Sequence, residues 1–184
     1  MNSAIRDHLD NIRSEDRQAQ GRAYLALQQE AREPVAWAYE AWDELIAALS
    51  HRDNRLRSIA AQLLCLLAAK SDPEERILRD FDRLIAVTRD ERFVTARHAL
   101  QSLWLIGAAG PKPRQRLLDS LAARYAECAG EKNCTLIRFD IIQSLRRLFD
   151  AAKDEKLHRL ALSLINAETD LKYRAKYAAL WKVQ

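Results

Sequence analysis

The sequence predicts an all-α protein of about ten helices in successive pairs, and three observations lead to this prediction. Apolar residues recur at spacings of three and four along most of the chain, as on the buried stripe of a helix. No segment alternates between apolar and polar residues as a half-buried strand would. The 184 residues include only 4 Gly and 4 Pro, too few for the many turns of a β architecture.

Polar interruptions set the expected helix ends in the first half of the chain. Residues 34–50 carry one apolar stripe and begin at Pro34, which suits a first helical turn. After this segment, Asp53 or Asn54 is a good N-cap for a helix over residues 54–70.

The remaining helices follow the same logic. Ser71 or Asp72 would cap a helix over residues 73–88, which Pro73 opens. The stretch GAAGPKP, residues 107–113, is the clearest break in the chain. The other helices are expected over residues 92–107, 113–130, 134–153, 155–167 and 169–182.

Successive helix pairs suggest an internal repeat. A small or apolar residue followed by small or apolar residues three and four positions later recurs at Ala23, Ala60, Ala96, Ile141 and Tyr177. The spacings between these anchors are 37, 36, 45 and 36 residues, so three of the four agree within one residue. The long spacing spans the GAAGPKP break.

The second helix of the second pair, DNRLRSIAAQLL (53–64), resembles the HEAT repeat pattern Asp-x-x-Val-Arg-x-x-Ala-x-x-Ala-Leu. DLKYRAKYAALW (170–181) is a second good copy. The resemblance implies one domain over residues 1–184, folded as a right-handed α-α superhelix of about five HEAT-like helical hairpins. The closely related armadillo-type arrangement fits the sequence almost as well. The expected repeats cover residues 2–32, 34–70, 73–109, 111–152 and 154–184.

The resemblance also implies a structural role for the Asp and the Arg, as a hydrogen-bonded ladder between successive units. Elementary chemistry agrees, because Asp caps a helix start and Arg can fork to a neighbouring carboxylate. We therefore interpret four residues as structural: Asp53, Arg57, Asp170 and Arg174. The departures from the pattern are Arg89 and Cys134 at the Asp position, and Gln20 and Phe93 at the Arg position.

No pattern that carries catalysis, a cofactor or a metal stands out. A Gly-rich phosphate loop, a His-x-x-x-His pair and a Gly-x-Ser-x-Gly elbow are all missing from the sequence. The histidines are scattered, one per region, and read as polar surface residues: His8, His51, His98 and His158. The sequence therefore predicts a protein that is not an enzyme and needs no cofactor or metal.

The cysteines and tryptophans are interpreted mainly as packing residues. Cys65 lies in the apolar run QLLCLLAA, while Cys128 and Cys134 are too isolated to suggest a disulfide framework or a metal site. Trp42 fits the core stripe of its helix. Trp37 lies about 140° round the same helix, which leaves both a buried and a partly exposed position open. Two more are expected to pack between repeats and close the stack: Trp104 and Trp181.

If the protein binds a partner, the resemblance implies that the second helices line the concave face of the stack. Positions two and five after each anchor point away from the core. They yield the candidate binding residues Gln62, His98, Gln101, Gln143, Arg146 and Lys182, with Cys65 and Ala179 in the same register. The stripe is polar and becomes basic toward the C-terminus, so it is either a solvated face or a recognition groove for an acidic or polar partner.

The predicted function is a non-enzymatic interaction module that binds another protein on its concave face. The alternative is a nucleic-acid-binding protein or a HEAT-like alkyl-base DNA glycosylase, suggested by Trp104, Arg97, Arg138 and Asp140 in adjacent second helices. The nearly neutral N-terminal half of the groove counts against nucleic acid. An accessory factor for cofactor attachment and a neutralising partner of a toxin are further possibilities.

Charge and hydropathy set the expected surroundings. The net charge of +4 permits weak attraction to anionic partners without requiring it. No apolar run approaches the roughly 20 residues that span a bilayer, and the N-terminal residues are too charged for a signal peptide. We therefore expect a cytoplasmic protein that makes no contact with membranes.

Overall fold

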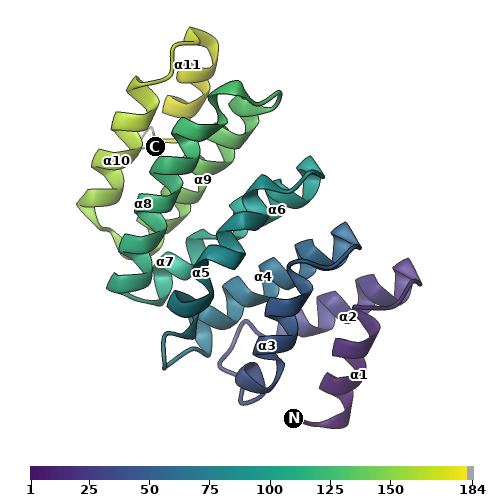
Figure 1. Cartoon of the computed structure of the whole chain (residues 1–184). Coiled ribbons are helices and arrows are strands. Elements are labelled where there is room, and N and C mark those ends of the chain that lie inside the picture. Colours follow the sequence, from purple (N-terminus) through teal and green to yellow (C-terminus); the bar gives the residue numbers. More distant parts are fainter. Residues whose placement is uncertain (182–184) are drawn as a thin grey trace.

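The computed structural model describes residues 1–181, and within this range every regular element is a helix (Figure 1). The predicted all-α class is therefore confirmed. No helix among these residues is long and apolar enough to cross a membrane. The α-helices are α1 (Ser3–Asn11), α2 (Arg17–Glu30), α3 (Ala38–Ala48), α4 (Asn54–Lys70), α5 (Arg76–Ala86), α6 (Phe93–Ser102), α7 (Trp104–Ala109), α8 (Pro111–Glu127), α9 (Cys134–Ala152), α10 (Glu155–Asn166) and α11 (Leu171–Ala179). The short 3-10 helices are η1 (Val87–Arg89) and η2 (Cys128–Gly130).

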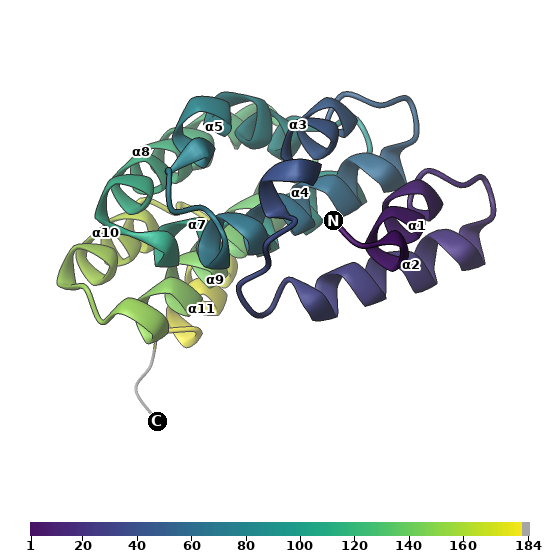
Figure 2. The ribbon, with the colours of Figure 1, turned by 90° about the horizontal axis from the view of Figure 1, so that it is seen from below.

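The helices form two layers in one row that runs from α1 and α2 to α10 and α11 (Figure 1). In the first-helix layer α3, α5, α8 and α10 contact one another in this order. In the second-helix layer the order of contact is α2, α4, α6, α9 and α11. Figure 2 shows that the row bends, with the first-helix layer on the outer side and the second-helix layer on the inner side. Chain neighbours are thus neighbours in space.

One apolar core runs between the two layers, and nearly every α-helix contributes to it. Ala60 has no exposed surface, and its helix α4 packs against α3, α6 and α7. Trp42 is fully buried, and Trp37, whose position was open, is also buried at 6% exposure. Trp181 is buried and Trp104 packs at the edge of the core. Packing therefore accounts for these tryptophans.

Two helices begin three or four residues later than predicted, because local hydrogen bonds hold the preceding residues outside the helix. The helix expected from residue 34 begins at Ala38, since the Val35 amide donates to Ser71 Oγ at 2.9 Å. The helix expected from residue 73 begins at Arg76. There the N-cap residue is Glu75, which forms no capping side-chain hydrogen bond. The carboxylate of Asp72 instead accepts from the amides of Arg76 (2.8 Å) and Ile77 (2.9 Å).

The helix predicted over residues 92–107 is divided at Leu103 into α6 and α7. Carbonyl oxygens just before the break accept hydrogen bonds from α9: Ser144 Oγ donates to Leu100 and Arg147 Nη1 donates to Gln101 at 3.1 Å. These oxygens would otherwise accept from the amides four residues later, so side chains that enter the helical ladder break it. The periodicity of the sequence cannot reveal such donors from another unit.

Charged hydrogen bonds join successive units. Arg57 donates from Nε and Nη2 to the two carboxylate oxygens of Asp90, at 2.6 and 2.8 Å. Arg138 Nη1 donates to Glu168 Oε2 at 3.0 Å. Each arginine thus reaches the acid of the following unit. In the repeat pattern Arg89 stands at the Asp position, and in the structure the next residue, Asp90, supplies the acid.

The first of these links uses an amide in place of an arginine. Asp53 caps α4 by accepting from the Arg55 amide at 3.0 Å. Its other oxygen accepts from Gln20 Nε2 at 3.2 Å and from Arg17 Nη1 at 2.7 Å. Gln20 therefore occupies the Arg position of the pattern while Arg17 supplies the charge. In the last unit Asp170 caps α11, whereas Arg174 forms no ion pair within residues 1–181.

Replacement of Ala60 by Trp should lower the free energy of unfolding by at least about 1–3 kcal/mol, because a large ring overfills the contact between helices. Urea denaturation followed by far-ultraviolet circular dichroism measures this change. Ala47→Trp on the exposed side of α3 is the matched control and should change stability little. Equal stability of both variants would contradict the packing described here.

The Asp90 carboxyl should make the free energy of unfolding depend on pH in the acidic range. Burial raises the pKa of this carboxyl, but hydrogen bonds from Arg57 and the Arg92 amide outweigh burial and lower the pKa below its ordinary value. Because the unfolded chain then binds the proton more readily, the stabilisation is present above about pH 4 and is lost as the pH falls through the native pKa. Urea unfolding at several pH values should show a shallower loss for Asp90→Asn than for the original protein. An equally steep loss in both proteins would exclude this role.

Candidate functional site

A groove of about 520 Å³ lies on the second-helix layer. Its walls come from α2, α4 and α6, so three successive units contribute to it. It is lined by Tyr24, Asn54, Arg55, Ser58, Ile59, Gln62, Val94, Thr95 and His98. Two predicted binding residues, Gln62 and His98, therefore belong to the same groove.

Hydrogen bonds fix the aromatic wall of the groove. The Tyr24 hydroxyl donates to Gln62 Oε1 at 2.9 Å and accepts from Gln28 Nε2 at 2.7 Å. Gln62 Nε2 donates to the Ser58 carbonyl oxygen at 3.1 Å. Partial burial raises the pKa of Tyr24, so its hydroxyl stays protonated at neutral pH. This series of hydrogen bonds links α2 to α4 and holds the Tyr24 ring in place.

Arg55 reaches from α4 to the start of α2. Its Nη1 donates to the Arg17 carbonyl oxygen at 3.1 Å. A Cβ atom on Gly21 would lie 3.0 Å from Arg55 Nη2, so the glycine leaves room for the guanidinium. Among the described residues that line the groove there is no Asp or Glu. Arg55 and His98 are among the lining residues. The groove is therefore neutral to positive.

Exposed aliphatic side chains occur on α2 and α6. Val94 lines the groove and is 64% exposed, and Leu25, next to Tyr24, is 61% exposed. Most large aliphatic residues of the chain are buried in the core. The groove thus combines accessible apolar surface with fixed polar groups, which is a common composition of binding sites.

Sequence reasoning missed the contribution of Ser58 and Val94. Both stand two positions before an anchor, whereas Gln62 and His98 stand two positions after one. At about 100° per residue all four point away from the anchor, so the same register could have found them. Tyr24, one position after its anchor, gave no such signal.

The other predicted residues do not join this groove. Gln101 is half-buried, and its Nε2 donates to Asp140 at 3.1 Å. Arg146 pairs with Asp150 on its own helix, at 2.9 Å, and Gln143 is half-buried. Lys182 lies outside the described residues. The register also fails for Cys65, which is fully buried as part of the core.

The residues that suggested a glycosylase are engaged with one another or with the core. Arg97 Nε and Nη2 donate to Asp140 at 2.7 and 2.9 Å, and the Asp140 side chain is 0% exposed. Arg138 pairs with Glu168 as described above. A buried carboxylate held by a guanidinium offers no surface to a substrate, so these residues connect helices here.

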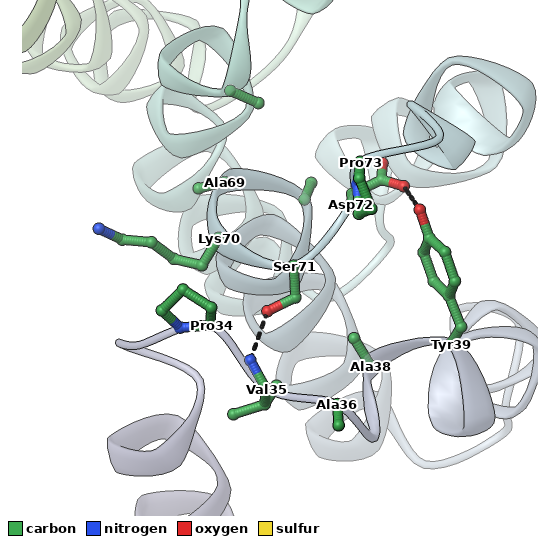
Figure 3. Close-up of a pocket in the computed structure, with 12 residues that line it drawn as sticks. Pro34, Val35, Ala36, Ala38, Tyr39, Ala69, Lys70, Ser71, Asp72 and Pro73 are labelled. Atoms are coloured by element: carbon green, nitrogen blue, oxygen red, sulfur yellow. Dashed lines mark hydrogen bonds between the residues drawn. The ribbon is translucent and has the colours of Figure 1, made fainter.

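A second hollow, of about 600 Å³, lies where the loops before α3 and α5 meet the end of α4 (Figure 3). Most of its polar groups bond to one another: Ser71 accepts from the Val35 amide, and the Tyr39 hydroxyl donates to Asp72 Oδ1 at 2.7 Å. Lys70 also lines the hollow. The rest of the lining is mostly Ala and Pro. Nothing in this hollow converges on one point as a catalytic or ligand-binding group would.

Potential metal ligands do not gather in the described part of the chain. Among residues 1–181 no three side chains of His, Cys, Asp or Glu come together as a metal site requires. The turn between α8 and α9 does, however, bring Cys128 Sγ and Cys134 Sγ to 3.1 Å. Their separation in the sequence gave no indication of this contact.

Comparison with known proteins identifies a likeness of fold. No protein-family model matches the chain, and no curated protein matches it significantly. A crystal structure of an engineered protein is similar over 98% of this chain, with 17% identity and a TM-score of 0.51. A second engineered protein is similar over 98% of this chain, with 16% identity and a TM-score of 0.48. The chain spans 47% of the first structure and 79% of the second. At these identities the first likeness concerns the fold alone.

Loss of the Tyr24 hydroxyl should weaken the link between α2 and α4. Tyr24→Phe removes the bonds to Gln62 and Gln28, which should lower the free energy of unfolding by about 1 kcal/mol. Chemical denaturation measures this loss. Tyr173→Phe is the control, because the Tyr173 hydroxyl forms no side-chain hydrogen bond within the described chain. A loss of the same size in the control would show that the Tyr24 bonds are not responsible.

Proposed function

We propose that this chain is a HEAT-like helical solenoid that binds another protein on its second-helix layer. The row of helix pairs, the ladder of charged hydrogen bonds and the repeat register support a HEAT-like unit. Solenoids of this kind use extended surfaces formed by several units as binding sites. In this proposal the layer on the inner side of the bend is the concave face of a right-handed superhelix.

The groove of α2, α4 and α6 carries the proposal, because it joins exposed aliphatic surface to an aromatic ring already fixed by hydrogen bonds. An ordered tyrosine loses little conformational entropy on binding, which favours it as an anchor. The partner segment would place an apolar side chain against Val94 and a carboxylate near Arg55 and His98. We therefore propose an acidic polypeptide segment as the occupant.

The groove also supports a protein partner over nucleic acid. Duplex binding generally needs a concentrated track of lysine and arginine along the phosphates. Among the residues that line the groove, only Arg55 carries a permanent positive charge. One such charge and a few amides suit a mixed polar and apolar peptide surface.

Site-specific photo-crosslinking in the native cells tests this function. A photoreactive amino acid at Val94 should capture one protein, and the capture should survive nuclease treatment. The same group at Leu162 is the control, because this leucine is also exposed but lies on α10, in the first-helix layer. Equal capture from both positions, or loss of the captured species after nuclease treatment, would contradict the proposal.

The captured protein then allows a quantitative test. Val94→Asp should weaken binding at least about tenfold, because it places a charge in the apolar part of the groove and repels an acidic partner. Leu162→Asp should leave the dissociation constant unchanged. Isothermal titration calorimetry measures both, and far-ultraviolet circular dichroism checks that the variants fold. Similar losses in both variants would remove the groove from the binding site.

A further inference from the structure

The turn between α8 and α9 places two thiols within reach of one another. Cys128 begins η2 directly after α8, and Cys134 is the first residue of α9. Their Sγ atoms are 3.1 Å apart. A disulfide bond is about 2.05 Å long, so the sulfur atoms need to approach by only about 1 Å.

Backbone bonds hold this turn closed independently of the thiols. The Glu131 amide donates to the Cys128 carbonyl oxygen at 2.8 Å, and the Cys134 amide donates to the Glu131 carbonyl oxygen at 3.1 Å. Arg124 Nη2 donates both to Glu131 Oε2 at 2.9 Å and to the Thr88 carbonyl oxygen at 3.2 Å. The two cysteines are therefore held near each other before any oxidation.

We propose that Cys128 and Cys134 form a reversible disulfide by exchange with a low-molecular-weight disulfide such as oxidised glutathione. Cys134 is half-buried and keeps some accessible surface, so it is the thiol that meets the reagent, whereas Cys128 is fully buried. Because the reagent can reach Cys134 and not Cys128, Cys134 reacts first and Cys128 second. The site is separate from the groove and does not depend on the function proposed for it.

The chemistry balances with two cysteines and one glutathione disulfide. Cys134 loses its thiol proton, and its thiolate attacks one sulfur of oxidised glutathione, which forms a mixed disulfide and releases the first glutathione thiolate. Cys128 then loses its proton and attacks Sγ of Cys134, which releases the second. The released thiolates take up the two protons. The protein dithiol is oxidised by two electrons while glutathione disulfide is reduced to two thiols.

The second step should be the slow one. Burial and the hydrogen bond with Cys134 raise the pKa of the Cys128 thiol to about 12, so little thiolate is present at neutral pH. The positive guanidinium groups of Arg138 and Arg124 act in the opposite direction. Attack by Cys128 requires its thiolate, and therefore the ring should close faster as the pH rises.

Redox titration of the folded chain tests the proposal. The protein is equilibrated in glutathione buffers from fully reduced to fully oxidised, quenched with acid, alkylated and digested with trypsin without reduction. Trypsin cleaves after Lys132, between the two cysteines. A disulfide therefore joins the peptides of residues 125–132 and 133–138, and dithiothreitol should separate them. Cys65 should remain unlinked, because it is fully buried.

Single substitutions test the order of the steps. Cys128→Ala should accumulate one glutathione on Cys134, because no second thiol can displace it. Cys134→Ser should react with glutathione at least about tenfold more slowly, because only buried thiols remain. Circular dichroism confirms that each variant folds. No linked peptide in excess oxidised glutathione, a link that forms only in urea, or a link to Cys65 would overturn the proposal.

Discussion

Every helix pair of this protein must bury its apolar side against the next pair, and the rest of the structure depends on that need. A pair of helices leaves one side of each helix uncovered, so it is stable only as part of a row. The contacts in both layers follow chain order, and one core runs along the row. Small residues such as Ala60 and Ala99, both without exposed surface, allow the second helices to approach closely.

The charged links between units add direction to this packing. Apolar contacts tolerate small shifts of one helix along another, whereas a guanidinium that forks to a carboxylate fixes both distance and orientation. Arg57 with Asp90 and Arg97 with Asp140 are such forks, and the acid of each pair is nearly or fully buried. These ion pairs fix the alignment of neighbouring helices as much as they stabilise the fold, since the cost of burying the charges offsets much of the attraction between them.

The sequence predicted the helical class, the order of the helix pairs and the caps at Asp53 and Asp170, because these depend on local periodicity and local hydrogen bonds. It could not predict the break at Leu103, which results from donors on α9, a helix that is distant in the sequence. The late start of α3 has a similar cause in Ser71. In the candidate groove, the repeat register predicted the outward positions of Gln62 and His98, whereas the place of the Tyr24 ring and the contact of Cys128 with Cys134 emerge only in three dimensions.

The links between units have a mechanical consequence. Because each link joins a helix pair only to the neighbouring pair, bending of the row is distributed over the successive interfaces between pairs. A ligand that lies across α2, α4 and α6 would fix the angles between these helices, and so the curvature of this part of the row. The end formed by α10 and α11 would keep its own elasticity, so the two ends of the molecule would differ in compliance.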